Sequence, residues 1–381
     1  KIKVSATMLY RFGKNGYTAL DWYDAPDPRP DYYRNLPSYF YMENSDYNRV
    51  NFMKYAWAKE AWTMDIPSIT HINWDRLYAV NTLNTTEAGK RSKYVIEERR
   101  TDQQDLNFAA NAKWSPLKYF TLTGGLSYKW NRTENYKILD DLLGGDYYVN
   151  IDQFAERDYA AYPTMIQNDL DYYLQNGKAQ TLKKGDKYGY DYYANVRRAE
   201  AWAAGRFTFA GLDASIAGRI GYTKFWREGL VRKGLFPGLD ANGAPMEFEG
   251  AEITTYDPIT KKAITSLGKS DVKDFLTGGV KLNLSYVIRG GHRVYADAAY
   301  VTDAPRFNQA FVSPRTRNSI VPDLKTSKTF AADLNYAYSN SGYDVRVTGY
   351  YTTIKDQSKV MSFYDDAQNS FTNFAMSGMD E

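Results

Sequence analysis

The sequence predicts an all-β protein whose antiparallel strands follow one another up and down. Three observations indicate this class: polar and apolar residues alternate in segment after segment, tyrosine is abundant, and short turns alternate with long connections. A period of two places successive side chains on opposite faces of a strand. Each segment is therefore expected to have one apolar face and one polar face.

The composition restricts the functional classes. The formal net charge of the 381 residues is only +3, which gives no indication of a nucleic-acid partner. The chain has no cysteine, which excludes disulfides, thiolate metal sites and cysteine nucleophiles. The mean hydropathy is −0.60, and no apolar run approaches the ~18 residues of a membrane helix. Tyrosine is the outlier with 35 residues, whereas the solid apolar runs typical of a buried soluble sheet are few.

Nine segments carry the alternation. In the first, Ile2, Val4 and Ala6 face one way, and Lys3 and Ser5 face the other. The predicted strands are residues 1–12, 105–114, 119–130, 197–210, 212–226, 275–288, 293–301, 334–338 and 343–352. A tenth strand is expected to begin near Ser370.

The connections alternate between short and long over four hairpins. Short turns are predicted at 115–118, 211, 289–292 and 339–342, and long regions at 13–90, 138–188, 228–269 and 302–323. Residues 51–62 predict a short helix, and residues 151–178 look partly helical with a break at Pro163. Loops of this length argue against strands in a compact soluble domain. A transmembrane β-barrel has them, with short periplasmic turns and long extracellular loops.

Strand length and aromatic placement favour the same class. A strand needs about 9–11 residues to cross an outer membrane, and residues 120–130 and 212–222 each have that length. Aromatic residues gather near the strand ends, as in the girdles of membrane barrels. On the short-turn side they are Trp114, Phe120, Phe209, Tyr286, Tyr338 and Tyr343, and on the long-loop side Trp130, Tyr222, Trp226 and Tyr351. The polar faces carry charged residues at mid-strand, which a wet or plugged lumen can hydrate or pair.

The last hairpin illustrates the two expected faces. Its turn, SNSG, lies on the short-turn side between Tyr338 and Tyr343, which we expect to form an interfacial aromatic pair. One set of side chains is predicted to face lipid: Leu334, Tyr336, Val345, Val347 and Tyr351. The other set is predicted to face the lumen: Asp333, Asn335, Asp344, Arg346 and Thr348.

Two stretches resemble a known family, the TonB-dependent outer-membrane transporters (receptors). IVPDLKTSKTFAADLNYAY, from Ile320 to Tyr338, resembles the late-barrel pattern Asn-Pro-x-Leu-Lys-Pro-Glu that leads into an aromatic-alternating strand. Three positions match it, namely Pro322, Leu324 and Lys325, and Val321, Thr326 and Ser327 depart from it. The following GYDVRVTGYYTTIKDQ is similar to the family's next strand. DWYDAPDPRPDYYRNLPSYF, residues 21–40, resembles a loop of members with a peptidase-regulatory-like N-terminal domain.

The resemblance implies a barrel of about 22 strands with an N-terminal plug inside it. Residues 1–381 would be an internal portion of that barrel, about nine or ten strands, without the plug, the TonB box or either barrel end. It implies active transport of a nutrient across a Gram-negative outer membrane, with energy from TonB, ExbB and ExbD through the plug. The implied partners are outer-membrane lipid, a small-molecule, glycan or peptide ligand, TonB and a surface lipoprotein, without nucleic acid or cofactor.

Two other classes are kept as alternatives. A passive outer-membrane porin would show the same hairpin logic without a plug. A soluble, aromatic-rich carbohydrate-binding or hydrolytic β-protein would show facing carboxylates in a cleft.

No catalytic or metal-binding residue is assigned from the sequence, and the chain is not expected to be an enzyme. The neighbouring carboxylates Asp140–Asp141 and Glu97–Glu98 cannot give the facing geometry of a glycosidase pair. The DANG stretch at 240–243 predicts a turn and lacks the spacing of a calcium loop. His71 and His292 have no partner at metal-ligand spacing. Neither a GxSxG nor a P-loop motif occurs.

The ligand-binding residues remain unknown at this level, although two long regions are rich in aromatics. Such side chains either stack on a sugar, peptide or aromatic ligand or pack the loops against one another, and packing is the favoured interpretation for each single residue. They are Trp22, Tyr23, Tyr32, Tyr33, Tyr39, Phe40, Phe154, Tyr159, Tyr162, Tyr172 and Tyr173.

Overall fold

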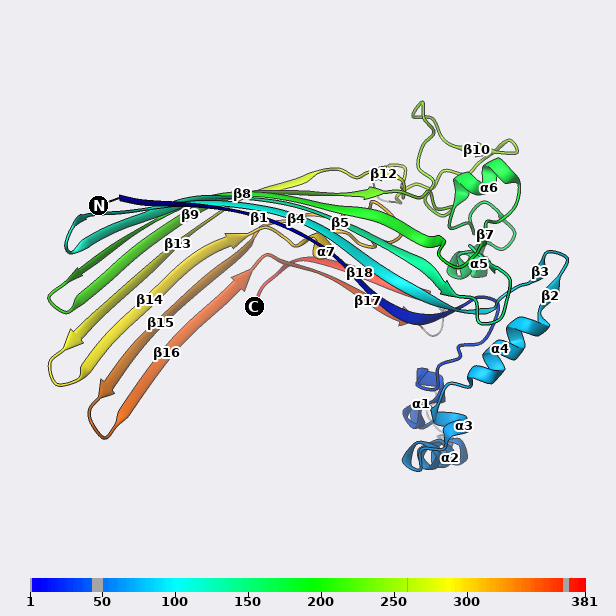
Figure 1. Cartoon of the computed structure of the whole chain (residues 1–381), viewed down its shortest axis with the longest axis horizontal. Helices are drawn as coiled ribbons and strands as arrows, with labels where there is room; N and C mark the ends of the chain where they lie inside the picture. The colour runs from blue at the N-terminus through cyan, green and yellow to red at the C-terminus, as the bar shows by residue number, and fades with distance from the viewer. Residues whose placement is uncertain (1, 43–50, 259, 366–369) are drawn as a thin grey trace. The chain divides into compact units, whose positions relative to one another are not determined.

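A large antiparallel up-and-down sheet dominates the computed structural model, which describes residues 2–42, 51–258, 260–365 and 370–381 (Figure 1). Its long strands are neighbours in chain order, and this confirms the predicted all-β class. They are β1 (Ile2–Trp22), β4 (Tyr94–Leu117), β5 (Phe120–Asp141), β8 (Lys187–Phe209), β9 (Leu212–Gly229), β13 (Lys273–Ile288), β14 (His292–Asp303), β15 (Ser327–Ser339) and β16 (Asp344–Lys355). The two-residue strand β12 (Gly268–Lys269) also pairs with β9.

The chain divides into two compact units. The first consists of Lys1–Asn15, Arg100–Tyr136 and Tyr190–Glu381, and the second of Gly16–Arg99 and Lys137–Gly189. Besides its sheet strands, the first unit contains β10 (Glu247–Phe248), β11 (Ala251–Glu252), α7 (Phe307–Ala310), β17 (Gln357–Asp365) and β18 (Ser370–Met379). The short elements of the second unit are η1 (Tyr33–Asn35), α1 (Pro37–Met42), α2 (Phe52–Thr63), α3 (Pro67–Thr70), α4 (Trp74–Leu83), β2 (Thr85–Thr86), β3 (Gly89–Lys90), β6 (Tyr148–Val149), α5 (Gln153–Tyr159), α6 (Leu170–Asn176) and β7 (Thr181–Leu182).

The helices predicted in residues 51–62 and 151–178 are present, and each begins at a residue whose polar side chain caps the first turn. Asn51 accepts a hydrogen bond from the backbone nitrogen of Lys54 at 3.1 Å and starts α2. Asp169 caps α6 in the same way, and Gly177 ends it with a φ of 67°. The break expected at Pro163 lies between α5 and α6. None of the helices in the described ranges has the length and apolar character needed to traverse a bilayer.

Four strands extend far beyond their predicted ends, and β15 begins at Ser327 rather than at residue 334. β1 continues to Trp22, β4 begins at Tyr94, β5 continues to Asp141 and β8 begins at Lys187, so the long regions are shorter than the sequence suggested. Simple alternation ends in these extensions because charged side chains are buried and paired there. Glu97, for example, has no exposed surface and bonds to Lys137.

The strand expected near Ser370 exists, but it does not extend the large sheet. β18 begins at Ser370 and pairs with β17, which was not predicted, in a separate two-stranded sheet. Nine long strands therefore form the sheet path within the described residues.

From β8 to β16 the register continues without a shift, so side chains of one kind stand in rows across the sheet. One row contains Phe209, Leu212, Tyr286, Val294, Tyr336 and Val347. The next contains Phe207, Ala214, Leu284, Ala296, Leu334 and Gly349. These apolar rows are exposed: 53% of Leu284, 60% of Leu334 and 62% of Val347 is accessible. The two faces predicted for the last hairpin are confirmed as faces of the sheet.

The buried apolar residues gather in small clusters rather than in one large core. In the first unit, Phe225, Ala310 and Phe311 pack together, with α7 lying over strand β9. In the second unit, one cluster contains Val95, Leu139, Tyr148, Leu182 and Tyr188, and another contains Leu77, Tyr94 and Leu143.

Four short turns join the sheet strands of the first unit and lie at one end of the sheet (Figure 1). The first falls at residues 118–119, slightly later than predicted, because β4 continues through Leu117. Ala210 and Gly211 both have positive φ, 49° and 85°, as a tight hairpin turn requires. In the third turn Gly290 and Gly291 have φ values of 82° and 84°.

Gly291 is a turn glycine whose substitution is costly for two reasons. A Cβ atom there would lie 2.1 Å from the carbonyl oxygen of Ser339, in the neighbouring strand, and an L-residue at that φ is strained by itself. We expect Gly291→Ala to lower the free energy of unfolding by more than the about 1–2 kcal/mol that the left-handed backbone alone costs.

The matched control is Gly342→Ala in the next turn, where the nearest atom to an added Cβ is 3.8 Å away. Urea unfolding in detergent or vesicles measures both variants. Equal losses for the two would contradict the assignment of the clash.

Candidate functional site: the polar face of the sheet

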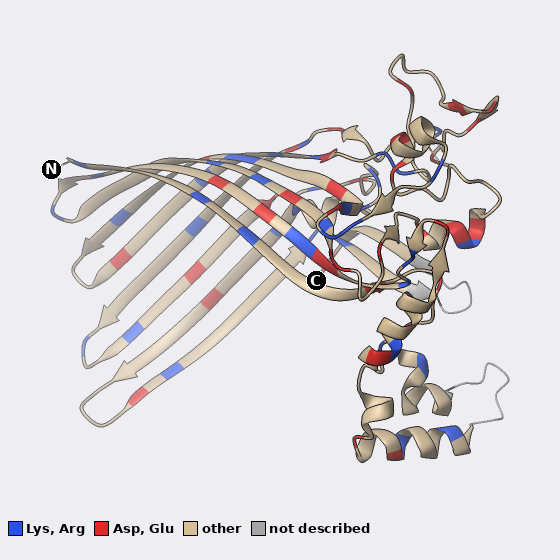
Figure 2. Cartoon of the chain, turned by 45° about the vertical axis from the view of Figure 1, so that its right-hand side comes forward, with Lys and Arg blue, Asp and Glu red and all other residues tan. Residues whose placement is uncertain are grey.

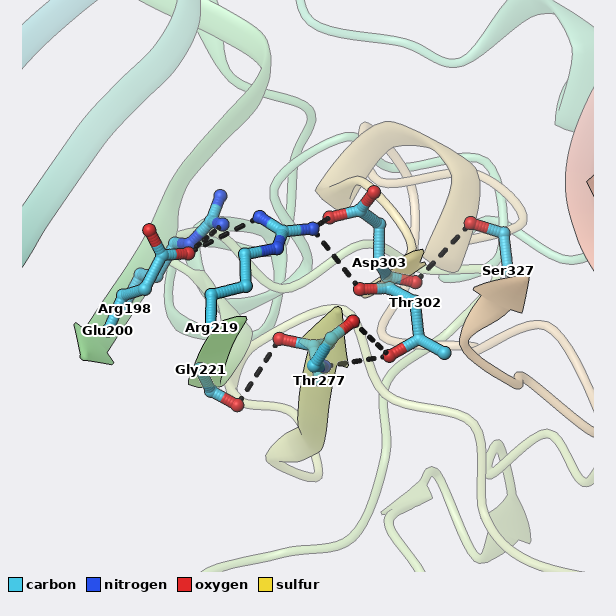
Figure 3. A network of polar contacts seen from close by, with 9 residues as sticks. Arg198, Glu200, Arg219, Gly221, Thr277, Thr302, Asp303 and Ser327 are labelled. Atoms are coloured by element: carbon cyan, nitrogen blue, oxygen red, sulfur yellow. Dashed lines mark hydrogen bonds and ion pairs between the residues drawn. The ribbon is translucent and has the colours of Figure 1, made fainter. Parts of the chain in front are cut away.

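The sheet face opposite the apolar rows carries a chain of paired charges in the first unit (Figure 3). Figure 2 marks where charged residues occur along the strands. Arg219 of β9 lies 3.3 Å from the Glu200 carboxylate of β8 and 2.6 Å from Asp303 of β14. Arg198 also contacts Glu200, at 2.6 Å. The chain of charges thus crosses from β8 to β14.

Glycine makes this crossing possible. Arg219 pairs in register with Gly279 of β13, and Gly279 pairs with Val301 of β14. Because Gly279 has no side chain, the guanidinium can reach over β13 to the carboxylate of Asp303. Gly279 is therefore a positional requirement of the ion-pair chain.

Hydroxyl groups extend the backbone ladder beside this chain (Figure 3). The Gly278 amide donates to Thr302 Oγ1 at 2.8 Å, and that hydroxyl donates to the Gly278 carbonyl at 3.2 Å. Thr277 donates to the Gly221 carbonyl at 3.2 Å. These bonds hold the strands in line where the ion pairs cross.

A second polar centre ties the first three strands together. Asp105 of β4 is buried and accepts from Arg11 of β1 and from Asn131 of β5, both at 2.7 Å. Lys129 lies 3.9 Å away. A buried carboxylate is tolerated when it is paired and hydrogen-bonded in this way.

Arg227 anchors two loops of the first unit to β9. It is 1% exposed, and it donates to the carbonyls of Pro314 at 2.6 Å and Ser266 at 2.7 Å, and to Asn318 at 2.5 Å. Its guanidinium lies 5.0 Å from the Tyr192 ring centroid. Burial lowers the pKa of Arg227 to about 10, so the side chain remains a cation at neutral pH.

The second unit is organised by a buried ionic cluster of four strands. Lys137 of β5 lies 2.7 Å from Asp21 of β1 and 2.9 Å from Glu97 of β4. Tyr188 of β8 donates to Asp21 at 2.9 Å, and its ring lies 4.1 Å from the Lys137 ammonium. Arg99 also pairs with Glu97. Two carboxylates therefore face two cations, and the cluster is balanced in charge.

The pKa values of the cluster follow from burial and from these partners. Burial raises the pKa of Asp21, but the attraction and hydrogen bonds of Lys137 outweigh it and leave that pKa below its usual value. Burial lowers the pKa of Lys137, and the charges of Asp21 and Glu97 more than reverse this. Burial, with the same two carboxylates, raises the pKa of Tyr188. The ionised Asp21–Lys137 pair and the neutral phenol of Tyr188 are thus the stable forms at neutral pH.

The aromatic residues of residues 21–40 mostly contact one another or a charged neighbour. Tyr33 lies between Tyr32 and Tyr39, with ring centroids 4.7 and 5.6 Å apart. Trp22 lies 5.1 Å from the Arg29 guanidinium. These contacts favour loop packing, the interpretation that the sequence favoured.

The second aromatic stretch divides into bound and exposed side chains. Tyr23, from the first aromatic stretch, donates a hydrogen bond to Glu156 of the second stretch at 2.7 Å. Tyr172 and Tyr173 on α6 are half-buried. Three aromatic side chains remain exposed: Phe154, Tyr159 and Tyr162. Within the described residues, these three are the sequence-predicted candidates that a ligand could reach.

The other motifs have structural partners. Asp240 accepts from the backbone nitrogens of Asn242 and Ala244 at 2.9 and 2.8 Å, so DANG is a turn as predicted. His292 hydrogen-bonds to the Tyr336 hydroxyl at 2.6 Å. No group of three His, Asp or Glu residues that could hold a metal ion occurs among the described residues.

Sequence reasoning missed the ionic cluster of the second unit. Asp21 and Tyr188 fall in regions expected to be irregular, and Lys137 immediately precedes one of them. Glu97 was considered only as half of an adjacent carboxylate pair. The only signal in the sequence was that single charged residues, far apart from one another, lie within alternating segments. Such residues can be matched as partners only when the order of the strands in the sheet is known.

The sequence matches no protein-family model and no curated protein sequence. Among solved structures, the chain is similar to the copper transporter OprC, with a TM-score of 0.44 and 12% identity over 75% of this chain and 35% of that one. It is also similar to a mutant of the ferric enterobactin receptor PfeA from Pseudomonas aeruginosa, with a TM-score of 0.30 and 10% identity over 70% of this chain and 40% of that one. The chain spans well under half the length of either protein, and similarities at this level assign it no ligand.

The Tyr188 pKa gives a prediction for alkaline pH. A phenol whose pKa is raised on folding contributes stability fully below its unfolded value of 10.0, and this contribution is lost as pH rises above that value. The pKa values of Tyr148 and Tyr23 are raised as well, so the free energy of unfolding should fall above pH 10. Tyr188→Phe should make this fall shallower by about 1.4 kcal/mol per pH unit.

Urea unfolding between about pH 8 and pH 11 measures the slope on both sides of the tyrosine pKa. The control is Tyr162→Phe, which removes an exposed phenol of the same unit. An unchanged slope in Tyr188→Phe would contradict the coupling of this hydroxyl to the buried carboxylates.

Proposed function

We propose that the chain forms part of the wall of an outer-membrane β-barrel that takes up a nutrient by active transport. The observation that carries this proposal is the contrast between the two faces of one sheet. Apolar rows are exposed on one face, and paired charges occupy the other. Soluble proteins rarely expose large contiguous apolar patches, so an exposed apolar surface that crosses six strands indicates contact with a membrane or a partner. Lipid is the solvent that suits it.

The dimensions of the strands support a membrane position. An apolar band about 25 Å tall needs strands of about 9–11 residues at a tilt of about 35–45°. Residues 212–222 of β9 and 276–286 of β13 fit it, and their outward side chains include Ile216, Ile220, Leu282 and Leu284. The exposed rings of Phe209 and Tyr286 lie at the short-turn end, and Tyr222 lies at the other.

The polar face suits a lumen. Arg219 forms ion pairs with both Glu200 and Asp303. These charges therefore keep a partner whether water or a plug domain fills the interior. In the proposed mechanism a separate plug transmits energy from TonB, ExbB and ExbD. The ligand is a small molecule, glycan or peptide, and a surface lipoprotein is a further proposed partner.

The exposed loop aromatics are the proposed ligand contacts. Phe154, Tyr159 and Tyr162 present rings to solvent, and rings of this kind stack on sugars and other planar or apolar ligand surfaces. The proposal includes no covalent chemistry by the chain.

Neighbouring residues of β16 provide a matched test of the two faces. Val347 belongs to an apolar row, and Thr348 lies on the opposite face, where it donates to Asn335 at 2.6 Å. A spin label at Val347→Cys in the full-length membrane protein should be accessible to oxygen and shielded from a polar nickel reagent. The label at Thr348→Cys should show the reverse, and equal polar accessibility at both sites would refute the lipid-facing assignment.

Uptake distinguishes active transport from a passive pore. A strain that lacks the full-length protein should lose growth on one nutrient among a panel of siderophores, cobalamin, glycans and peptides, and the gene should restore it. Removal of TonB should reduce uptake to the level of the strain that lacks the full-length protein. Uptake that persists without TonB would overturn active transport and favour a passive porin.

A further inference from the structure

The outward face of the sheet carries a group of cations immediately beyond the apolar band, on the long-loop side. Their placement follows from the register. Arg197 of β8 pairs directly with Lys224 of β9. Each lies an even number of residues from Phe209 or Leu212 on its own strand, so both are on the face of the apolar rows. Lys269 of β12 pairs with Glu228 on the same face. With Arg132 of β5, these residues form a basic belt, defined here as Arg132, Arg197, Lys224 and Lys269.

Aromatic rings hold the belt cations in place. The Arg197 guanidinium lies 4.8 Å from the Trp130 ring centroid and 5.2 Å from that of Trp226. Lys269 lies 4.9 Å from the same Trp226 ring. Arg132 lies 3.7 Å from the Tyr193 ring. A cation over an aromatic face is partly desolvated and oriented, which prepares it to bind an anion.

The belt is not neutralised by its own carboxylates. Two carboxylates lie beside it: Glu228 is 3.8 Å from Arg132 and pairs in register with Lys269, and Asp274 pairs in register with Lys224 and accepts from the Tyr222 hydroxyl at 3.1 Å. The four cations of the belt therefore outnumber these two carboxylates. Arg197 donates from Nη1 to the carbonyls of Asn131 and Val196, and its Nε and Nη2 make no hydrogen bond within the described part of the chain. Like charges placed directly opposite each other, as Arg197 and Lys224 are, destabilise a sheet. An anion over the pair would remove this cost.

The level of the belt matches a lipid headgroup. From Phe209 to Arg197, a strand rising about 3.3 Å per residue covers about 40 Å, or about 30 Å along the membrane normal at a tilt of about 40°. The apolar band itself is about 25 Å tall, so the Arg197 guanidinium lies just beyond it. At the same height along the strands, the opposite face of the sheet is covered by the packed rings of Phe225 and Phe311. The belt cations therefore lie only on the outward face.

We propose that the basic belt binds the phosphate of an anionic lipid headgroup in the leaflet on the long-loop side. The inference rests on the proposed membrane function and adds a specific lipid contact to it. The free fork of Arg197 takes the phosphate in bidentate fashion, and Lys224 and Lys269 add charge at its edges.

The test uses the full-length protein in detergent micelles and bis-phosphorylated lipid A, with dephosphorylated lipid A as the comparison. The double variant R197Q/K269Q should weaken binding of the phosphorylated lipid by about fivefold for each charge removed. The control is K281Q, which removes a cation from the opposite face of β13, where Lys281 pairs with Ala217 and Ala299. It should bind like the unaltered protein.

The other outcomes are equally decisive. Unchanged binding by R197Q/K269Q, equal losses in R197Q/K269Q and K281Q, or equal affinity for the dephosphorylated lipid would each overturn the proposal. Displacement of the lipid by inorganic phosphate in excess would also overturn it, because the site would then select free phosphate. Heat-modifiable migration on a gel verifies that each variant is folded. If the belt fails while the Val347 label still reports lipid, only this inference falls and the proposed function stands.

Discussion

The structure depends on one constraint, an uninterrupted backbone register from β8 to β16. Because no bulge shifts this register, every second residue of six strands falls on the same face, and small local preferences add up to two continuous surfaces. A shift of one residue in a single strand would place charges such as Asp333 among the apolar rows. The short turns protect the register, since Ala210, Gly211 and Gly291 adopt backbone angles that fix the hairpins.

The molecule uses its charges in three ways. On the polar face, Arg219 satisfies carboxylates on two strands because Gly279 leaves the space between them open. On the apolar face, charges are confined to the end of the strands, where Arg197 lies between tryptophan rings. In the second unit, Lys137 is buried between two carboxylates, and the desolvation cost is offset by direct pairing. Position along the strand therefore decides whether a charge is structural or available to a partner.

The described residues form only small apolar clusters and no large apolar core, as expected for a sheet with one apolar face exposed. A soluble protein must bury most of its large apolar side chains, whereas here Leu284, Leu334 and Val347 remain exposed in rows. The clusters that do form, such as Phe225 with Ala310 and Phe311, fix loops to strands rather than sheets to each other. The strands are then joined by the hydrogen-bonded ladder and by ionic cross-links such as Asp105 with Arg11 and Asn131.

The all-β class, the nine strands of the sheet, their four short turns and the two faces of the last hairpin could be predicted from the sequence. This was possible because alternation is a local signal with a period of two residues, and turns have their own local chemistry. Prediction failed where strands carry charge at buried positions, so the ends of β1, β4, β5 and β8 were misjudged. The start of β15 and the pairing of β18 with β17 were misjudged as well. Only the tertiary structure brought Asp21, Glu97, Lys137 and Tyr188 together, and only the strand order placed Arg197 beside Lys224 and two tryptophans. Those contacts join residues far apart in the chain, and no local pattern specifies which strand will be the neighbour.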